Sequence, residues 1–240
     1  MSEIDNKRII IALDFPDAAS TRNLLRVLDP AQCRVKIGKE LFTRCGPSLV
    51  EEVIRNGFDL FLDLKFHDIP NTVGKAVAAA ADLGVWMVNV HASGGRDMMM
   101  AARQAVANSQ HKPLVIAVTV LTSMSQSDLA DIGVNVSPQE HVKRLALLAQ
   151  QCGMDGVVCS AAETEMLRAA CGADYVLVTP GIRPVGDDAN DQKRIVTPVD
   201  AVKAGSSYLV IGRPVTQAEK PGEKLDEIFR QLHGNFPNLC

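Results

Sequence analysis

Lysine and aspartate alternate near the ends of three apolar runs in the first third of the chain. Asp14 follows the first run, Lys36 lies in the second, Asp63 and Lys65 lie in the third, and Asp68 comes shortly after. Residues i and i+2 of a strand share a face, so Asp63 and Lys65 are expected to point the same way. Such an alternating set keeps its members ionised, because each charge is flanked by opposite charges. A fixed, charged array of this kind is suited to electrostatic and acid–base catalysis.

The same spacing also fits a purely structural network. In that interpretation, ion pairs among these residues close one end of the fold, and Asp68 caps a helix that begins near Pro70. The DxKxxD spacing alone does not separate the two interpretations.

Two segments near the C-terminus have features typical of phosphate binding. Gly212 and Arg213 follow an apolar run, and Arg183 follows another. Glycine allows a phosphate to approach the backbone, and an arginine can donate to two phosphate oxygens at once. The connection 185–194 after Arg183 is longer than usual for this kind of loop, which is typical of a lid. A plain turn with an exposed arginine, and a surface insertion, are the structural alternatives.

The elements that must position these residues alternate regularly along the chain. Eight apolar, β-branched runs are each followed by a helical pattern, which gives about 30 residues per unit in 240 residues. This predicts an α/β fold, a (β/α)8 TIM barrel that forms a single domain over residues 1–240, with its site at the carboxyl ends of the strands. A doubly wound sheet is the alternative, but no GxGxxG follows the first strand. The strands are expected at Arg8–Asp14, Cys33–Gly38, Phe58–Lys65, Trp86–His91, Leu114–Thr122, Gly156–Ser160, Tyr175–Thr179 and Tyr208–Gly212.

The helical patterns have recognisable beginnings and ends. Prolines are expected at helix starts, where a missing N–H costs nothing, and glycines at helix ends. The prolines are Pro16, Pro47, Pro138 and Pro198, and the glycines are Gly57, Gly84, Gly153, Gly172 and Gly205. The helices are expected at Pro16–Leu28, Pro47–Asn56, Thr72–Leu83, Arg96–Ala107, Pro138–Cys152, Ala161–Cys171, Pro198–Ala204 and Gly222–Leu232.

Composition excludes several classes of protein. The 25 Lys+Arg against 28 Asp+Glu give a net charge of −3, which argues against a general nucleic-acid or membrane surface. The longest apolar runs are strand-sized, well short of a membrane span. The six cysteines form no CxxC pair or zinc pattern, so free thiols are expected. With no signal pattern at the N-terminus, a cytoplasmic protein is predicted.

At these residues the chain resembles the orotidine 5′-phosphate decarboxylase family, and its bacterial members most closely. The segment 61–72, FLDLKFHDIPNT, carries the most specific part of the resemblance. The other matching segments follow in order from about residue 8 to the C-terminus: they are ALD at 12–14, VKIGKE at 35–40, VTVLTSM at 118–124, VTPGIRP at 178–184, Asp191-Gln192, and IGRP at 211–214.

The resemblance implies a role for each matching residue. Lys65 would donate a proton, within a catalytic array of Lys36, Asp63, Lys65 and Asp68. Asp14 and Lys36 would contact the ribose. Thr122 would contact the pyrimidine, with the adjacent Ser123 as the alternative. The residues on the phosphate side would be Arg183, Gln192, Gly212 and Arg213. Asp68, Ile69 and Thr72 would reach into the site of a second subunit, which implies a homodimer with shared active sites.

The implied reaction is the decarboxylation of orotidine 5′-phosphate to UMP in pyrimidine biosynthesis. Loss of CO2 from C6 leaves a carbanion in the ring plane, where the π system cannot absorb it. An electron-sink cofactor therefore offers no obvious help, and no cofactor or metal is expected. A fixed ammonium beside C6 can stabilise the charge and then protonate it, the role expected of Lys65.

Two other functions remain open on the sequence. One is a magnesium-dependent sugar-phosphate decarboxylase or aldolase with the same DxKxxD. In those relatives a carboxylate ends the second strand, where this chain has Lys36, and they lack the long Gln192 loop. The other is a phosphate-binding barrel without catalytic activity that acts as a regulator, although no member of the charged array is missing.

Overall fold

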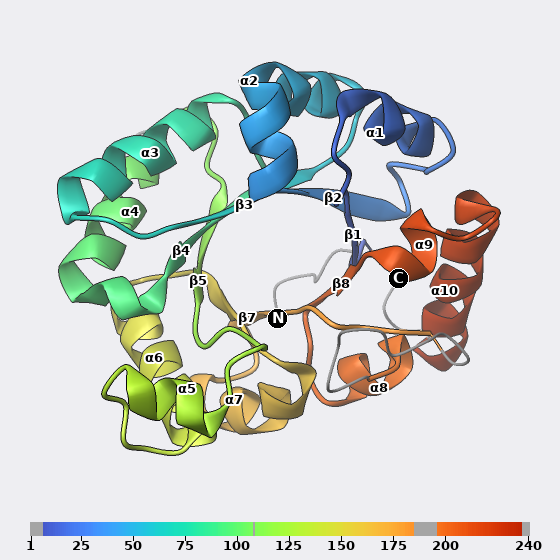
Figure 1. Cartoon of the computed structure of the whole chain (residues 1–240). Coiled ribbons are helices and arrows are strands. Elements are labelled where there is room, and N and C mark those ends of the chain that lie inside the picture. The colour runs from blue at the N-terminus through green and yellow to red at the C-terminus, as the bar shows by residue number, and fades with distance from the viewer. Residues whose placement is uncertain (1–6, 108, 185–195, 237–240) are drawn as a thin grey trace.

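The computed structural model describes residues 7–107, 109–184 and 196–236. Eight parallel strands form a closed barrel in chain order, and the first strand pairs with the eighth. Helices surround the barrel (Figure 1). The strands are β1 (Ile9–Ala12), β2 (Cys33–Gly38), β3 (Leu60–Phe66), β4 (Met87–His91), β5 (Leu114–Val118), β6 (Gly156–Val158), β7 (Val176–Thr179) and β8 (Tyr208–Ile211).

The described helices follow the strands in the expected alternation. They are α1 (Ala18–Leu25), α2 (Lys39–Arg55), α3 (Pro70–Asp82), α4 (Gly95–Ala107), α5 (Gln126–Asp131), α6 (Pro138–Gln151), α7 (Thr164–Cys171), α8 (Pro198–Lys203), α9 (Arg213–Thr216) and α10 (Pro221–Asn235), with 3-10 turns at Ala92–Gly94 and Ala161–Glu163. None of the helices in the described part of the chain is long and apolar enough to cross a membrane.

The predicted (β/α)8 barrel is confirmed, and an open doubly wound sheet is excluded by closure of the barrel. Each predicted strand is present, with ends that differ by a few residues. The five glycines expected at helix ends all have positive φ, from 76° at Gly153 to 108° at Gly205. Glycine suits these positions because it lacks the Cβ that penalises this conformation.

Helix α2 differs most from its prediction. It begins at Lys39 rather than Pro47, because the residues directly after β2 already form a helical segment. Gly46, with φ 66° and ψ −167°, interrupts the helix, and Pro47 begins its second segment. Helix α1 begins at Ala18 rather than Pro16, because the side chain of Asp17 accepts from the Ser20 N–H and caps the helix there.

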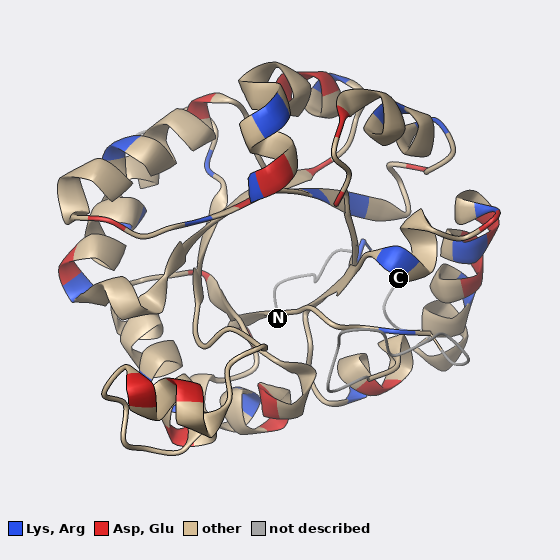
Figure 2. Cartoon of the chain, viewed as in Figure 1, with Lys and Arg blue, Asp and Glu red and all other residues tan. Residues whose placement is uncertain are grey.

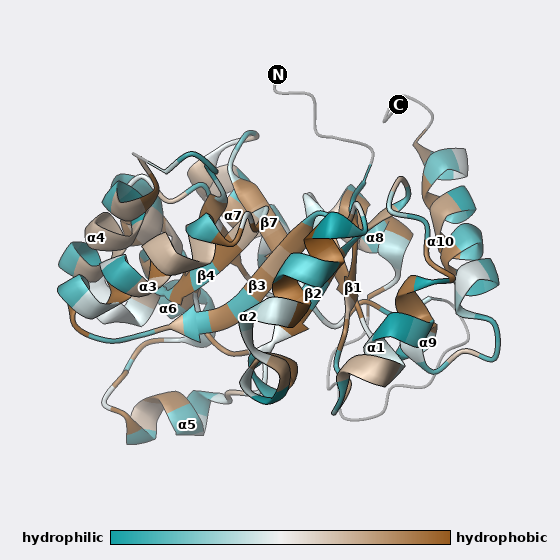
Figure 3. Ribbon diagram, turned by 90° about the horizontal axis from the view of Figure 1, so that it is seen from above, coloured by the Kyte–Doolittle hydropathy of each residue, from teal (hydrophilic) through white to brown (hydrophobic). Residues whose placement is uncertain are grey.

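Two short helices were not predicted. Helix α5 starts at a capping box formed by Ser125 and Asp128, and α9 directly follows β8. Both lie beyond the carboxyl ends of strands, and α5 projects away from the ring of longer helices (Figure 3). They are short insertions at the end of the barrel where a site is expected.

Alternation along the strands separates two apolar layers. Phe61 packs inside the barrel, in a cluster with Ile10, Met87 and Ile116, whereas Leu60 and Leu62 join the larger layer between strands and helices. Arg34, also on the inner face, lies 4.1 Å from the Trp86 ring centroid and pairs with Asp59. Since Arg34 precedes Lys36 by two residues, this cation closes the amino-terminal end and leaves the carboxyl end for the site.

Candidate active site

A chain of alternating charges runs across the carboxyl ends of the first three strands. The Lys65 ammonium lies 2.6 Å from Oδ1 of Asp63, and Oδ2 of Asp63 lies 3.3 Å from the ammonium of Lys36. Lys36 Nζ in turn lies 3.3 Å from Oδ1 of Asp14. Among the described strands only β2 and β3 carry charged residues, whereas charge is common on the surrounding helices (Figure 2). The array is therefore a local feature of an otherwise apolar barrel.

Mutual attraction keeps the two most buried members of this chain ionised. Burial by itself raises the pKa of Asp63, but the ammonium groups of Lys36 and Lys65 outweigh it, and the net pKa is lowered. Burial lowers the pKa of Lys36, but Asp63 and Asp14 outweigh it, and the net pKa is raised. If either group lost its charge, each of its charged neighbours would lose an ion pair at this site.

Lys65 owes its position to an irregularity in the sheet. The pairing of β3 with β4 shifts register between Leu62 and Phe66, and Lys65 has φ 51°, which makes it the one non-glycine residue of positive φ in the described chain. A non-glycine residue in this region costs about 1–3 kcal/mol and persists only where its surroundings impose it. Here the Lys65 N–H donates to Oδ1 of Asn89 at 2.8 Å.

A cavity of about 640 Å³ opens beside the charged chain. Three of its wall residues, Asp14, Lys36 and Asp63, belong to that chain, and Lys65 contacts the wall through its ion pair with Asp63. The volume suits a small molecule of nucleotide size. The remaining lining residues are Ala12, Phe15, Pro16, Pro180, Gly181, Arg183, Val210, Gly212, Arg213, Thr216 and Gln217.

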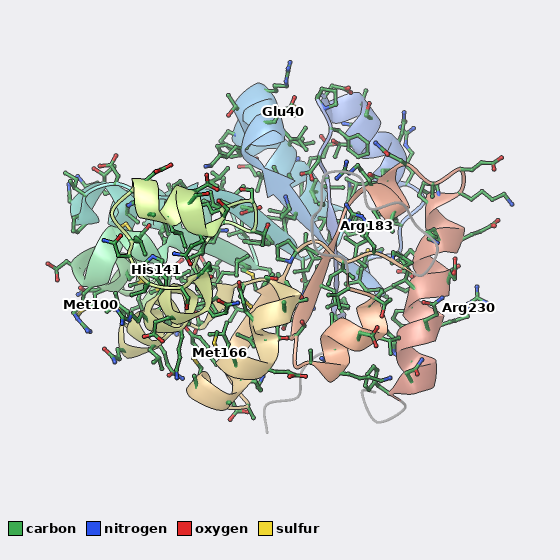
Figure 4. All side chains as sticks on the ribbon, turned by 60° about the horizontal axis from the view of Figure 1, so that its bottom comes forward. Glu40, Met100, His141, Met166, Arg183 and Arg230 are labelled. Carbon is green, nitrogen blue, oxygen red and sulfur yellow. The ribbon has the colours of Figure 1, made fainter. Side chains whose placement is uncertain are left out.

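The wall of this cavity also carries the arginines expected on the phosphate side. Gly212 precedes α9 and Arg213 begins it. Arg183 is buried, and its backbone N–H donates to the carbonyl of Val196, which ties the two ends of the long connection together. Arg183 lies toward the middle of the barrel, whereas Arg230 and Met100 lie on outer helices (Figure 4). One cavity thus joins a buried charged array to two arginines.

Four of the predicted residues lie away from this cavity. Asp68 and Ile69 line a separate hollow of about 600 Å³, Thr72 is exposed in the first turn of α3, and Thr122 is exposed in the turn after β5. Asp68 does not cap α3, because Ile69 occupies the N-cap position. The Asp68 carboxylate instead accepts from the neighbouring Ile69 N–H at 2.6 Å. Gln192, with the rest of 185–195, lies outside the described residues.

Comparison with known proteins agrees with this geometry. The model of the orotidine 5'-phosphate decarboxylase / HUMPS family matches residues 7–228. The chain belongs to this family. It is 62% identical to the orotidine 5'-phosphate decarboxylase of Marinomonas sp. (strain MWYL1), over 89% of this chain and 91% of that protein. It is 60% identical to that of Alcanivorax borkumensis, over 93% and 97%. The solved orotidine 5'-phosphate decarboxylase of Lactobacillus acidophilus superposes with a TM-score of 0.84, at 36% identity, over 94% and 99%.

Sequence reasoning missed several polar residues at the site of this family member. Asn89 hydrogen-bonds to both Asp63 and Lys65, and Thr216 and Gln217 of the α9 region line the cavity. A signal for Asn89 was present, since it is a polar residue in the apolar strand MVNVH, two residues from the inward Met87. Thr216 and Gln217 had no such signal, because α9 itself was not predicted.

His91, two residues beyond Asn89, is held neutral. Its half-buried ring lies 5.5 Å from the ring of His67, centroid to centroid. Burial, and then the nearby His67, Lys39 and Lys65, lower its pKa to about 4. In the unfolded chain a histidine has a pKa near 6.5.

This difference predicts a pH dependence of stability. Between pH 6.5 and about 4 the unfolded state binds a proton at position 91 that the folded state does not, so the free energy of unfolding falls as the pH drops. We expect His91→Gln to flatten this fall, measured by urea unfolding across that range. An equally steep fall in the variant would assign the effect to other groups.

Proposed function

We propose that this chain is the carboxy-lyase that converts orotidine 5'-phosphate to UMP in pyrimidine biosynthesis. The observation that carries the proposal is the Lys65–Asp63 ion pair of 2.6 Å, held in a buried chain of alternating charges at the cavity of a member of this family. The two named relatives at 60% and 62% identity support it.

The reaction requires a fixed positive charge near C6 rather than a cofactor. The bond between C6 and the carboxylate carbon breaks, its electron pair stays on C6, and CO2 leaves. The C6 pair lies in the ring plane, orthogonal to the π system, so the ring cannot delocalise it. The Lys65 ammonium would stabilise this charge and then donate its proton to C6, which yields UMP. Lys65 regains the proton from solvent.

The other charged residues would set up this step. Asp63 would orient the Lys65 ammonium. Its negative charge would also repel the substrate carboxylate that leaves as CO2. Lys36 holds Asp63 ionised and, with Asp14, would bind the ribose hydroxyls. Thr122 would contact the pyrimidine from the turn after β5.

The phosphate would lie against Gly212, Arg213 and Arg183 in the cavity wall, with Gln192 closing over it. Phosphate contacts take no part in bond breaking. They supply binding energy that positions C6 beside Lys65 and is available to drive closure of the site.

A second copy of the chain would complete each site. Asp68, Ile69 and Thr72 lie outside the substrate cavity, and Ile69 is 66% exposed, so its apolar side chain is available to a partner. In a homodimer these residues would reach the partner's cavity and place Asp68 in its charged array. A cytoplasmic location is also proposed, which the five free described cysteines support, since thiols persist in reducing compartments.

Replacing Lys65 tests the reaction itself. We expect the wild-type protein, in EDTA, to remove the ultraviolet absorbance of orotidine 5'-phosphate and yield UMP. Lys65→Ala should lower kcat by at least about 10⁴-fold, because it removes both the charge and the proton donor. Lys203→Ala, an exposed lysine at the end of α8, serves as the matched control with full activity. Turnover by a folded Lys65→Ala protein would contradict the mechanism.

Replacing Arg213 tests the phosphate side. Loss of its charge-assisted hydrogen bonds should raise KM for orotidine 5'-phosphate about 100-fold. Turnover of orotidine, which lacks the phosphate, should change by less than about 2-fold. Arg230→Ala on the outer face of α10 is the control. An equal loss with both substrates would remove Arg213 from phosphate binding.

Mixing two inactive variants tests the shared site. Lys65→Ala and Asp68→Ala should each be inactive alone. Random exchange of subunits should restore about a quarter of wild-type activity, because half of the dimers are hybrids with one intact site. The measurement is kcat before and after the two proteins are mixed, dissociated and reassembled. No recovery, with hybrids detected by mass spectrometry, would place Asp68 in its own subunit's site.

A further inference from the structure

Asn89 occupies a singular position in the barrel. On either side of the register shift Leu62 pairs with Val88 and Phe66 pairs with Val90. Three residues of β3, which are Asp63, Leu64 and Lys65, therefore face a single residue of β4, Asn89. The backbone of one residue cannot form hydrogen bonds with the N–H and C=O groups of three residues. The remaining backbone groups of β3 therefore need other partners, such as a side chain.

The Asn89 amide supplies one such partner, to the backbone of Lys65, and it also binds the side chain of Asp63. Its Oδ1 accepts from the Lys65 N–H at 2.8 Å, and its Nδ2 donates to Oδ1 of Asp63 at 2.7 Å. That same oxygen of Asp63 accepts from the Lys65 ammonium at 2.6 Å. Asn89 is fully buried, so water does not compete for these bonds.

We propose that Asn89 is a positioning residue for the decarboxylation, one that fixes the Lys65 ammonium and the Asp63 carboxylate in their reactive arrangement. This inference rests on the proposed function. Asn89 would not touch the reacting atoms. It would act through two constraints, one on the backbone of Lys65 and one on the carboxylate plane of Asp63.

The backbone constraint follows from the conformation of Lys65. At φ 51° a residue with a Cβ is strained and needs a partner that makes relaxation unfavourable. If the Lys65 N–H moved away from Asn89, both groups would be left buried without a hydrogen bond. The bond thus holds the strained backbone from which the lysine side chain projects.

The carboxylate constraint follows from the shared oxygen. Asp63 faces Lys65 with Oδ1 and Lys36 with Oδ2, so rotation of its carboxylate would disturb both ion pairs. The bond from Asn89 to Oδ1 restricts that rotation. A shift of about 1 Å at catalytic groups can lower rates about 100-fold, which sets the expected scale.

The first test replaces the amide with an apolar group of similar size. We expect Asn89→Leu to lower kcat about 100-fold, while the dissociation constant of UMP stays within about 3-fold, since the phosphate contacts are remote. Thr164→Val is the matched control. Its hydroxyl is equally buried and donates to the Ala161 carbonyl at 2.7 Å, outside the site. It should lower Tm and leave kcat unchanged.

The second test keeps an oxygen at position 89 that can accept from the Lys65 N–H, and it replaces the amide NH2 with a group that donates only when protonated. Asn89→Asp places a carboxylate against Asp63, and two carboxylates in contact share a proton, which raises the pKa of one of them. The charged groups near position 89 are Asp63 and Lys65 on β3, with Lys36 paired to Asp63 from β2. The titratable His91, two residues along β4, has its pKa lowered to about 4 and is therefore neutral in the pH range of this test. Below the raised pKa the protonated carboxyl group at position 89 donates as the amide did, and above it the donor is lost. The kcat of Asn89→Asp relative to wild type should therefore rise as the pH falls from about 8 to about 5.

The outcomes separate the inference from the function on which it rests. Wild-type kcat in either folded Asn89 variant, or a loss in Asn89→Asp that does not change with pH, would overturn the positioning role. Inactive wild-type protein would overturn the proposed function instead. In that event crystal structures of wild type and Asn89→Leu test whether Asn89 holds the backbone of Lys65 in its positive-φ conformation. Lys65 leaving its positive φ in the variant supports it, and an unchanged Lys65 overturns it.

Discussion

The structure depends on the confinement of alternating charges at one end of an apolar barrel. Lys36 and Asp63 are almost completely buried, which would neutralise either one alone, yet each is held ionised by its neighbours. Each of these two buried charges has two oppositely charged neighbours, so loss of one member weakens the balance of charge for the others. Fixed charges of this kind need no reorganisation when charge develops in a reaction, and a low-dielectric surrounding strengthens their effect.

The rest of the fold holds this arrangement in place. Parallel pairing of β1 with β2 and of β2 with β3 juxtaposes Asp14, Lys36 and Asp63. The sheet departs from regular pairing where Lys65 has to reach Asp63, and the strain of that departure is balanced by the buried Asn89 bonds. The arginines that line the same cavity come from the β7 and β8 connections, so they and the charged array are supplied by different strands.

Much of this was predictable from the sequence, because apolar periodicity and turn residues define strands and helices locally. The i, i+2 rule placed Asp63 and Lys65 on one face. It could not show that Lys65 reaches there through a register shift, since that depends on how β3 pairs with β4. The early start of α2 at Lys39 and the short α5 lack long periodic patterns, so they were missed. The role proposed for Asp68 requires a second chain, about which neither periodicity nor a single copy carries information.

The central claim is that the Lys65 ammonium stabilises and protonates a carbanion at C6. By microscopic reversibility, the same group must be able to remove the C6 proton of UMP. The direct measurement is the exchange of that proton for deuterium in D2O, followed by NMR with saturating enzyme. The account predicts deuterium at C6 with the wild-type protein and none above background with Lys65→Ala, although both bind UMP. Undiminished exchange in Lys65→Ala would contradict it.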